Sequence, residues 1–373
     1  MEGDQAADEL KRIVTQSTGA WAGCFKNILL GVSGGLDSSI VASVLSERGA
    51  QMTCFTMITD DPTGDERLYA RMLTRHLRQP LVEKFHNAGE VNLAESNSLH
   101  VPRPNFYALG QSTKAAKFDL AKAIPYDGFF SGVGGDNVFC FLSSATPLVD
   151  RVRKEGLGAG AWATAIDICD MTDCSLFDVV MMAAKRMMDG DVSYKWRTNS
   201  DFLLPDAPGT AVLDLHPWLD APTDALPGKA VHIAMLARIQ GTIDGYSRRR
   251  RETQITPLIC QPVMEFCLGI PTWLWCAGGQ NRSVARRAFA GQLPPEIISR
   301  RSKGGPSGFA FDLIMENRAV LRELILDGEL VRHGIIDKVA MDAVLVEETL
   351  RHSDKHLRIM SIADAEAWAR HWS

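Results

Sequence analysis

A short apolar run that ends in a turn of glycines and serines constrains the fold of this 373-residue chain more than any other segment. Residues 27–32 have the length and composition of a buried strand, and residues 40–47 are apolar enough to form a helix. Seven residues join them: Ser33, Gly34, Gly35, Leu36, Asp37, Ser38 and Ser39. We therefore expect a strand, a tight turn and a helix in immediate succession, with the polar residues at 37–39 capping the helix.

Strand and helix patterns alternate along the first 150 residues. Further patterns typical of strands occur at 52–58, 81–85 and 127–131, and patterns typical of helices occur at 8–25, 65–77 and 114–123. This alternation predicts an α/β fold with a doubly wound parallel sheet. The strand pattern fades after about residue 150, so we expect residues 1–150 to form an α/β part and residues 151–373 to form a mainly helical part. The methionine-rich stretch 181–188 favours a helix whose methionine side chains lie in the core.

The first turn has the composition of an anion site. Glycines let the backbone approach an anion closely, and the free amides at a helix start point toward it. The hydroxyls of Ser33, Ser38 and Ser39 add donors. Asp37 would be a poor neighbour for a phosphate unless a hard cation such as Mg²⁺ lay between them. The spacing differs from GxxxxGK[ST], because no lysine follows the second glycine, and also from GxGxxG.

A second glycine-rich turn follows the strand expected at 127–131. It consists of Ser131, Gly132, Val133, Gly134, Gly135 and Asp136. The carboxyl ends of parallel strands meet at the same edge of a sheet, and ligands of such sheets bind there. The two turns can therefore face one site.

Composition and charge argue against several classes of protein. The net charge of −5 is unfavourable for non-specific nucleic-acid binding. No apolar stretch has the ~20 residues needed to span a bilayer, and the acidic, polar start of the chain is unlike a secretory signal. The eight cysteines are scattered without a CxxC pair, which indicates reduced thiols. We expect a cytoplasmic protein with no nucleic-acid and no membrane partner.

The first turn resembles the PP-loop of the ATP pyrophosphatases, in the form found in the asparagine synthetase family. The similarity extends over residues 25–310 and includes the second turn, whose aspartate binds Mg²⁺ in the family. Shorter matches are Pro257-Leu258 with Glu265-Phe266, Arg287-Ala288, Leu293-Pro294 and Arg301-Ser302-Lys303. The resemblance implies a PP-loop sheet fold, in which residues 1–150 bind the nucleotide and residues 151–373 complete the synthetase site.

By the same resemblance, the protein is an AMP-forming carbon–nitrogen ligase that adenylates a carboxylate and joins it to an amine. ATP and Mg²⁺ are the implied cofactors. The residues implied to bind ATP are Ser33, Gly34, Gly35, Asp37, Ser38, Ser39 and Gly134. Asp37 and Asp136 would share Mg²⁺ with the pyrophosphate, and Lys303 would act as a catalytic residue that stabilises the reacting phosphate and acyl oxygens.

The chain departs from the asparagine synthetase pattern at three places. Residue 2 is Glu2, where the glutamine-dependent enzyme has a cysteine, so we expect no glutaminase half. Val133 stands where asparagine synthetase has a glutamate and β-lactam synthetase a tyrosine, and valine can neither accept a proton nor bind an amine. Glu252 lies one residue away from the family's other acidic position, which makes it the candidate general base.

Four segments, at 134–139, 216–218, 257–265 and 282–290, resemble lasso peptide cyclases. Those enzymes adenylate an Asp or Glu side chain of a precursor peptide, whose own N-terminal amine then closes a macrolactam ring. The resemblance implies a precursor peptide as substrate, and a companion leader peptidase and a leader-binding protein as partners. Two alternatives stay open: a small-molecule amide ligase, either ammonia-dependent and asparagine synthetase-like or β-lactam synthetase-like, and a non-catalytic binding module that keeps the fold.

Overall fold

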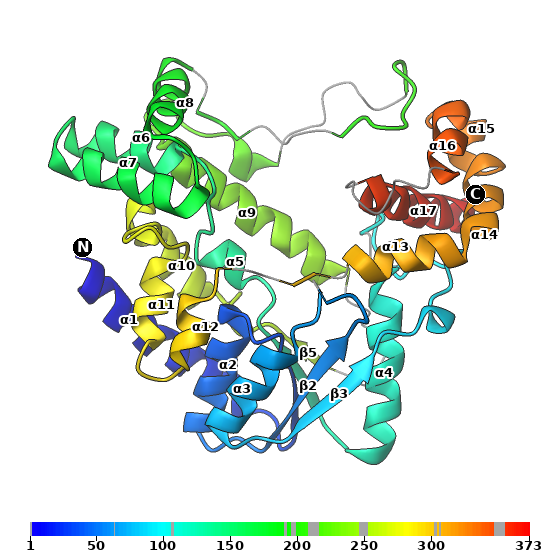
Figure 1. Cartoon of the computed structure of the whole chain (residues 1–373), viewed down its shortest axis with the longest axis horizontal. Coiled ribbons are helices and arrows are strands. Elements are labelled where there is room, and N and C mark those ends of the chain that lie inside the picture. Colours follow the sequence, from blue (N-terminus) through cyan, green and yellow to red (C-terminus); the bar gives the residue numbers. More distant parts are fainter. Residues whose placement is uncertain are drawn as a thin grey trace.

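A parallel sheet lies at the base of the molecule and helices surround it (Figure 1). The computed structural model describes residues 2–62, 64–105, 108–189, 192–194, 199–207, 216–245, 253–301, 304–305, 307–346 and 355–373. Five strands of this part pair in parallel in the order β3-β2-β1-β4-β5. The strands are β1 (Ile28–Gly31), β2 (Met52–Ile58), β3 (Leu81–Phe85), β4 (Gly128–Ser131) and β5 (Thr253–Ile255). The predicted α/β class with a doubly wound parallel sheet is confirmed.

Alternate strand residues pack against helices on opposite faces of the sheet, as the period of two requires. Leu30 of β1 belongs to a large apolar core with α1 (Gly3–Ala22), α2 (Leu36–Glu47) and α3 (Arg67–Leu77). Its neighbour Leu29 faces the other way, toward Leu120 of α4 (Gly110–Ala123). Because both faces are covered, the central strands are mostly apolar and do not alternate between apolar and polar residues.

The order of the strands reverses beside β1. The chain runs from β1 through β2 to β3 on one side, and β4 and β5 lie on the other side. Gly31 and Ser131 are paired at the carboxyl ends of β1 and β4, so the turns after these strands start next to each other. Such a switch point is where open α/β sheets bind ligands.

The second half of the chain is mainly helical, as predicted, but it also supplies β5. This strand has only three residues, which is too few for a recognisable alternation, and the sequence did not predict it. The helices of this half and of the preceding loop are α5 (Gly135–Val138), α6 (Thr146–Glu155), α7 (Ala159–Thr172), α8 (Leu176–Met188), α9 (Pro227–Asp244), α10 (Gln261–Gly269), α11 (Ser283–Phe289), α12 (Pro295–Ser299), α13 (Ser307–Glu316), α14 (Arg318–Leu326), α15 (Glu329–Arg332), α16 (Lys338–Leu345) and α17 (Lys355–Trp372). Short 3-10 turns occur at Ala88–Glu90, Pro217–Leu219 and Thr272–Trp275.

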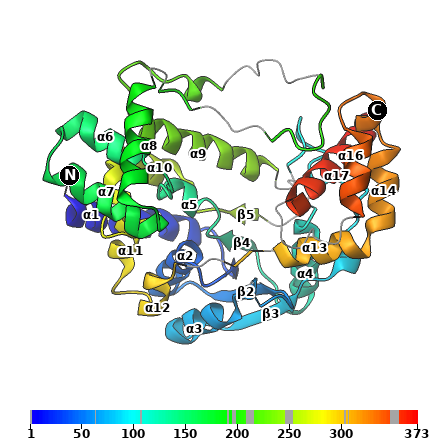
Figure 2. The same ribbon diagram turned by 45° about the horizontal axis from the view of Figure 1, so that its top comes forward.

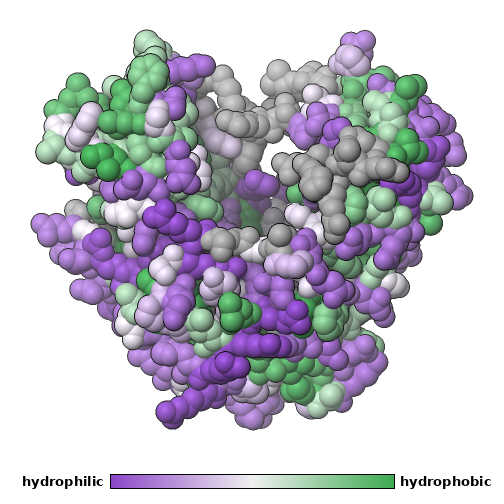
Figure 3. All heavy atoms as spheres, in the orientation of Figure 1, coloured by the Kyte–Doolittle hydropathy of each residue, from purple (hydrophilic) through white to green (hydrophobic). Residues whose placement is uncertain are grey.

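Two groups of helices stand apart above the carboxyl edge of the sheet (Figure 2). Helices α6, α7 and α8 share one small apolar core, and α13, α14, α16 and α17 share another. Figure 3 shows the surface hollowed between the two groups. No helix in the part of the chain that the structure describes is both long and apolar enough to cross a membrane.

The prediction that the methionine-rich stretch lies in a core was wrong. Met181 and Met188 on α8 are 52% and 80% exposed, and Phe177 on the same helix is 72% exposed. Only Val179 and Ala183 of α8 are buried, against α6 and α7. On α8, an apolar side chain is therefore no indication that the residue is buried.

Candidate active site

The two glycine-rich turns press against each other at the switch point. A Cβ atom on Gly132 would lie 2.4 Å from the backbone nitrogen of Ser38. A Cβ atom on Gly135 would lie 2.2 Å from Cγ of Asp37. Only glycine permits this approach, so the second turn is shaped to bring Asp136 beside the start of α2.

The first turn is held together by its own serines. The Ser33 and Ser38 hydroxyls lie 3.3 Å apart, the Gly35 amide donates to Ser33 Oγ, and Ser38 Oγ donates to the Gly35 carbonyl. Helix α2 begins at Leu36 with Gly35 as its N-cap, and no side chain caps it. The predicted cap at 37–39 was therefore wrong. The amides at the start of α2 keep no side-chain partner of the capping kind, which suits an anion site.

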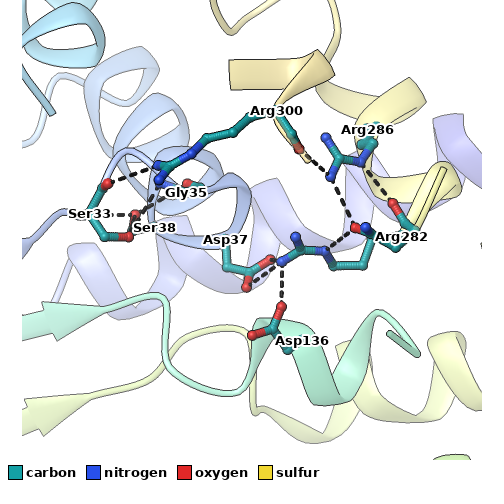
Figure 4. A network of polar contacts seen from close by, with 9 residues as sticks. Ser33, Gly35, Asp37, Ser38, Asp136, Arg282, Arg286 and Arg300 are labelled. Atoms are coloured by element: carbon teal, nitrogen blue, oxygen red, sulfur yellow. Dashed lines mark hydrogen bonds and ion pairs between the residues drawn. The ribbon is translucent and has the colours of Figure 1, made fainter. Parts of the chain in front are cut away.

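A guanidinium group lies between the two predicted metal ligands (Figure 4). Nη1 of Arg282 is 3.0 and 2.9 Å from the two carboxylate oxygens of Asp37, and 2.5 Å from Oδ1 of Asp136. The side chains of Arg282 and Asp37 are only 10% and 12% exposed. Two carboxylates, at the starts of α2 and α5, thus converge on one positive charge in a largely buried place.

The backbone of Arg282 is in an uncommon conformation. Its φ is +55°, in the left-handed region, and the residue forms the N-cap of α11. Its guanidinium also lies over the ring of Phe141, 5.1 Å from the ring centre. An arginine in the left-handed region carries a conformational cost, and such residues cluster at functional sites.

A second buried arginine holds the backbone around Arg282. Arg286, one turn along α11, donates to the carbonyls of Asn281, Ile298 and Arg300 and to the Asn281 side chain. Burial, with a smaller effect of neighbouring Arg282, lowers the pKa of Arg286 to about 10. This pKa keeps the group charged at neutral pH. Arg286 therefore fixes the segment before α11 and the segment after α12 relative to each other.

A third arginine reaches the first turn from residue 300. Nη1 of Arg300 donates to the Ser33 carbonyl at 3.4 Å, and Nη2 donates to Glu66 at 2.9 Å. The guanidinium also stacks over the Tyr69 ring, 3.9 Å from its centre. Arg300 is thus held against the turn by residues at the start of α3.

A cavity of ≈ 330 Å³ lies at the carboxyl edge of the sheet, between the two turns and the arginines at 282 and 300. The polar part of its lining includes Ser33, Gly35, Asp37, Ser38, Arg282 and Arg300, and the apolar part includes Phe55, Met57, Phe129, Val133 and Phe141. The volume is that of a small-molecule site. A ligand with both anionic and flat apolar groups matches this mixed lining.

A model of the asparagine synthase family matches residues 26–370, which is nearly the whole chain. The chain belongs to this family. Its members are ATP-dependent ligases that form amide bonds, so this chain is an ATP-dependent amide ligase. A comparison with curated proteins finds no match.

The family implies Mg²⁺, and the residues present are suited to it. Asp37 and Asp136 converge on a single point, where they now contact the cationic Nη1 of Arg282. No group of three or more His, Cys, Asp and Glu side chains arranged for a metal occurs in the described part of the chain. Mg²⁺ typically uses one or two carboxylates together with phosphate oxygens and water. The donor set therefore fits an ion that arrives with a nucleotide, provided that Arg282 moves aside.

The predicted site residues differ in where the structure places them. Four of the predicted ATP-binding residues line the cavity: Ser33, Gly35, Asp37 and Ser38. The other three do not line it: Gly34 packs on Tyr69, Ser39 is fully buried, and Gly134 packs on Ile259. Asp136 joins the site through Arg282. Lys303 and Glu252, the predicted catalytic residues, lie outside the described residues, so their roles stay predictions.

The arginines that the structure brings to the site were not predicted as site residues from the sequence. Arg282 and Arg286 are four residues apart in a segment that is otherwise rich in alanine and valine. Charged residues at that spacing on an apolar helix are usually buried only when they are paired. This signal could have marked Arg282 and Arg286 as functional, although it could not have named Asp37 and Asp136 as the partners.

Proposed function

We propose that the protein activates a carboxylate as an acyl-adenylate, releases pyrophosphate and joins the acyl group to an amine. The main support for this proposal is that the first turn, Asp37 and Asp136 converge at the switch point of the sheet. A leaving pyrophosphate needs hydroxyl and amide donors, positive charge and a metal between it and any carboxylate. The cavity lining offers the hydroxyls of Ser33 and Ser38, the start of α2, and the positive charges of Arg282 and Arg300.

In this proposal, the chain orients ATP and stabilises charge. Ser33, Ser38 and the amides at the start of α2 bind the β- and γ-phosphates, and Arg282 and Arg300 offset their charge. The apolar residues of the cavity lining receive the adenine ring. Mg²⁺ on Asp37 and Asp136 would neutralise the charge that develops on the phosphates. The substrate carboxylate attacks the α-phosphorus, Lys303 offsets charge at that centre, and the amine then displaces AMP with Glu252 as the candidate base.

We further propose that the substrate is a lasso peptide precursor and that the bond formed closes its macrolactam. The resemblance of four segments to lasso peptide cyclases supports this, and so does Val133, which lines the cavity with an apolar side chain. Valine offers no hydrogen bond to ammonia or to the polar head of a small amino acid. A peptide brings its own amine and depends less on that position. A companion leader peptidase and a leader-binding protein are the proposed partners.

A dehydration assay tests this substrate. The protein is incubated with ATP, Mg²⁺ and a leaderless peptide that has a free N-terminal glycine and an Asp or Glu a short ring away. We expect mass spectrometry to show the loss of one water, and the product to resist N-terminal sequencing because its amine is in the ring. Peptides with an acetylated N-terminus or with Asn or Gln at the acceptor position serve as matched controls and should stay unchanged.

Formation of asparagine from aspartate and ammonia, with no dehydration of any peptide, would contradict the lasso proposal. It would leave the chain as a small-molecule amide ligase of the same family.

A further inference from the structure

A carboxylate at the start of α3 connects the first turn to the segment that contains Lys303. Oε1 of Glu66 accepts from Nη2 of Arg300 at 2.9 Å and from the backbone amide of Gly304 at 3.2 Å. Gly304 is the residue that follows Lys303 in the sequence. One oxygen atom is therefore hydrogen-bonded on both sides of residues 301–303.

This contact is buried and charged. The side chains of Glu66 and Arg300 are 14% and 6% exposed. A charge-assisted hydrogen bond in such a place is stronger than a neutral one and fixes direction as well as distance. Arg300 in turn donates a hydrogen bond to the Ser33 carbonyl, so Arg300 links the Glu66 carboxylate to the first turn.

The backbone around Glu66 also packs closely against the 304–305 segment. A Cβ atom on Gly304 would lie 2.7 Å from Cγ of Glu66 and 2.9 Å from the carbonyl oxygen of Gly64. A Cβ atom on Gly64 would lie 2.6 Å from the carbonyl oxygen of Gly305. The loop after β2 and the segment at 304–305 thus meet backbone to backbone, and a side chain at either glycine would push them apart.

We propose that Glu66 is a positioning residue that holds Arg300 and Gly304 beside the first turn, and that the catalytic role proposed for Lys303 depends on this contact. This inference rests on the proposed function, because it assigns Lys303 to the adenylation step. Glu66 acts through Arg300 and the Gly304 amide and contacts no reacting atom. Displacing a catalytic group by ~1 Å can lower a rate by ~10²-fold.

Two variants and a control test the inference. Glu66→Ala removes both contacts, whereas Glu66→Gln keeps an oxygen acceptor without the charge. Glu83→Gln is the matched control, because Glu83 also pairs with an arginine, Arg71 of α3 at 2.5 Å, and contacts neither the cavity nor the described residues among 300–305. The readouts are hydrogen–deuterium exchange of a peptide spanning residues 300–305 without nucleotide, and the kcat and KM for ATP of ATP–pyrophosphate exchange in the presence of the leaderless peptide of the dehydration assay.

We expect Glu66→Ala to speed amide exchange in this peptide by roughly fivefold or more, since a native hydrogen bond is lost. Its kcat should fall by ~10- to 100-fold while the KM for ATP changes by less than ~3-fold, the pattern of a group that acts on the transition state. Glu66→Gln should fall between Glu66→Ala and the wild type, and Glu83→Gln should match the wild type in both readouts.

Unchanged amide hydrogen exchange in Glu66→Ala would overturn the inference. Faster amide hydrogen exchange with a wild-type kcat would also overturn it, because the contact would then be structural only. If Glu66→Ala fails to fold, the amide hydrogen exchange and the kcat of Glu66→Gln test the inference in its place, and wild-type values of both would overturn it. A wild-type protein without ATP–pyrophosphate exchange would contradict the proposed function instead, and the amide exchange would still decide whether Glu66 holds the segment.

Discussion

At the scale of residues, the site depends on how the repulsion between two neighbouring carboxylates is neutralised. Asp37 and Asp136 would repel in a largely buried place without a cation, and in this structure Arg282 contributes that charge. The arrangement explains why an arginine accepts a left-handed backbone at position 282. We infer that the metal competes with this guanidinium for the two carboxylates and that it does so together with the phosphates of ATP.

Neutralising either carboxylate should disable turnover. Asp37→Asn and Asp136→Asn should each lower the rate at least ~10²-fold, the scale for losing one electrostatic stabiliser. Asp37→Asn should also cost more stability, roughly 1.5–3 kcal/mol, because both oxygens of this buried carboxylate bond Arg282. Steady-state kinetics and chemical denaturation measure the two effects.

Asp4→Asn is the matched control for these variants. Asp4 pairs with Arg287 of α11 at 3.0 Å, but both side chains are exposed. Its rate and stability should stay close to wild type. A normal rate in either Asp37→Asn or Asp136→Asn would contradict the metal assignment.

At the scale of elements, a buried histidine connects α9 to the second turn. Nε2 of His232 lies 3.0 Å from the carbonyl of Val138, at the end of α5. Burial, reinforced by the nearby Lys229 charge, lowers the pKa of His232 from 6.5 to about 3. The folded protein therefore keeps this ring neutral where the unfolded chain would protonate it.

The consequence is a loss of stability in acid. Above pH 6.5 the ring is neutral in both states and contributes no pH dependence. Between pH 6.5 and about 3 the unfolded state binds the extra proton, so His232 should lower the free energy of unfolding by up to ~1.4 kcal/mol per pH unit. The free energy of unfolding, measured by urea denaturation between pH 7 and pH 4.5, should depend less steeply on pH in His232→Gln than in the wild type. Equal slopes would refute the role of His232.

The elements of the sheet were predictable from sequence where their pattern was long enough. Strands β2 and β3 match the predicted ranges, and the glycine turns identified both loops of the site. Strand β5, with three residues, carried too little pattern to be recognised. The contact of Arg282 with Asp37 spans 245 residues and depends on a left-handed backbone, and neither property leaves a local trace in the sequence.

At the scale of the whole molecule, both halves of the chain build the cavity. The sheet supplies the two turns, and the segments around α11 and α12 supply the arginines (Figure 4). The helical groups on either side border the hollow above this edge (Figure 3). The division of the chain near residue 150 stays a prediction, and we propose that the two parts act as one catalytic unit.

The nucleotide products test the central claim most directly. Phosphorus NMR follows ATP in the presence of Mg²⁺ and either a candidate precursor peptide or aspartate with ammonia. Adenylation transfers the acyl group to the α-phosphorus, so we predict AMP and pyrophosphate in equal amounts with the amide product. ADP and inorganic phosphate as products would contradict the account, because they would mean attack at the γ-phosphorus and a different use of the serine turn.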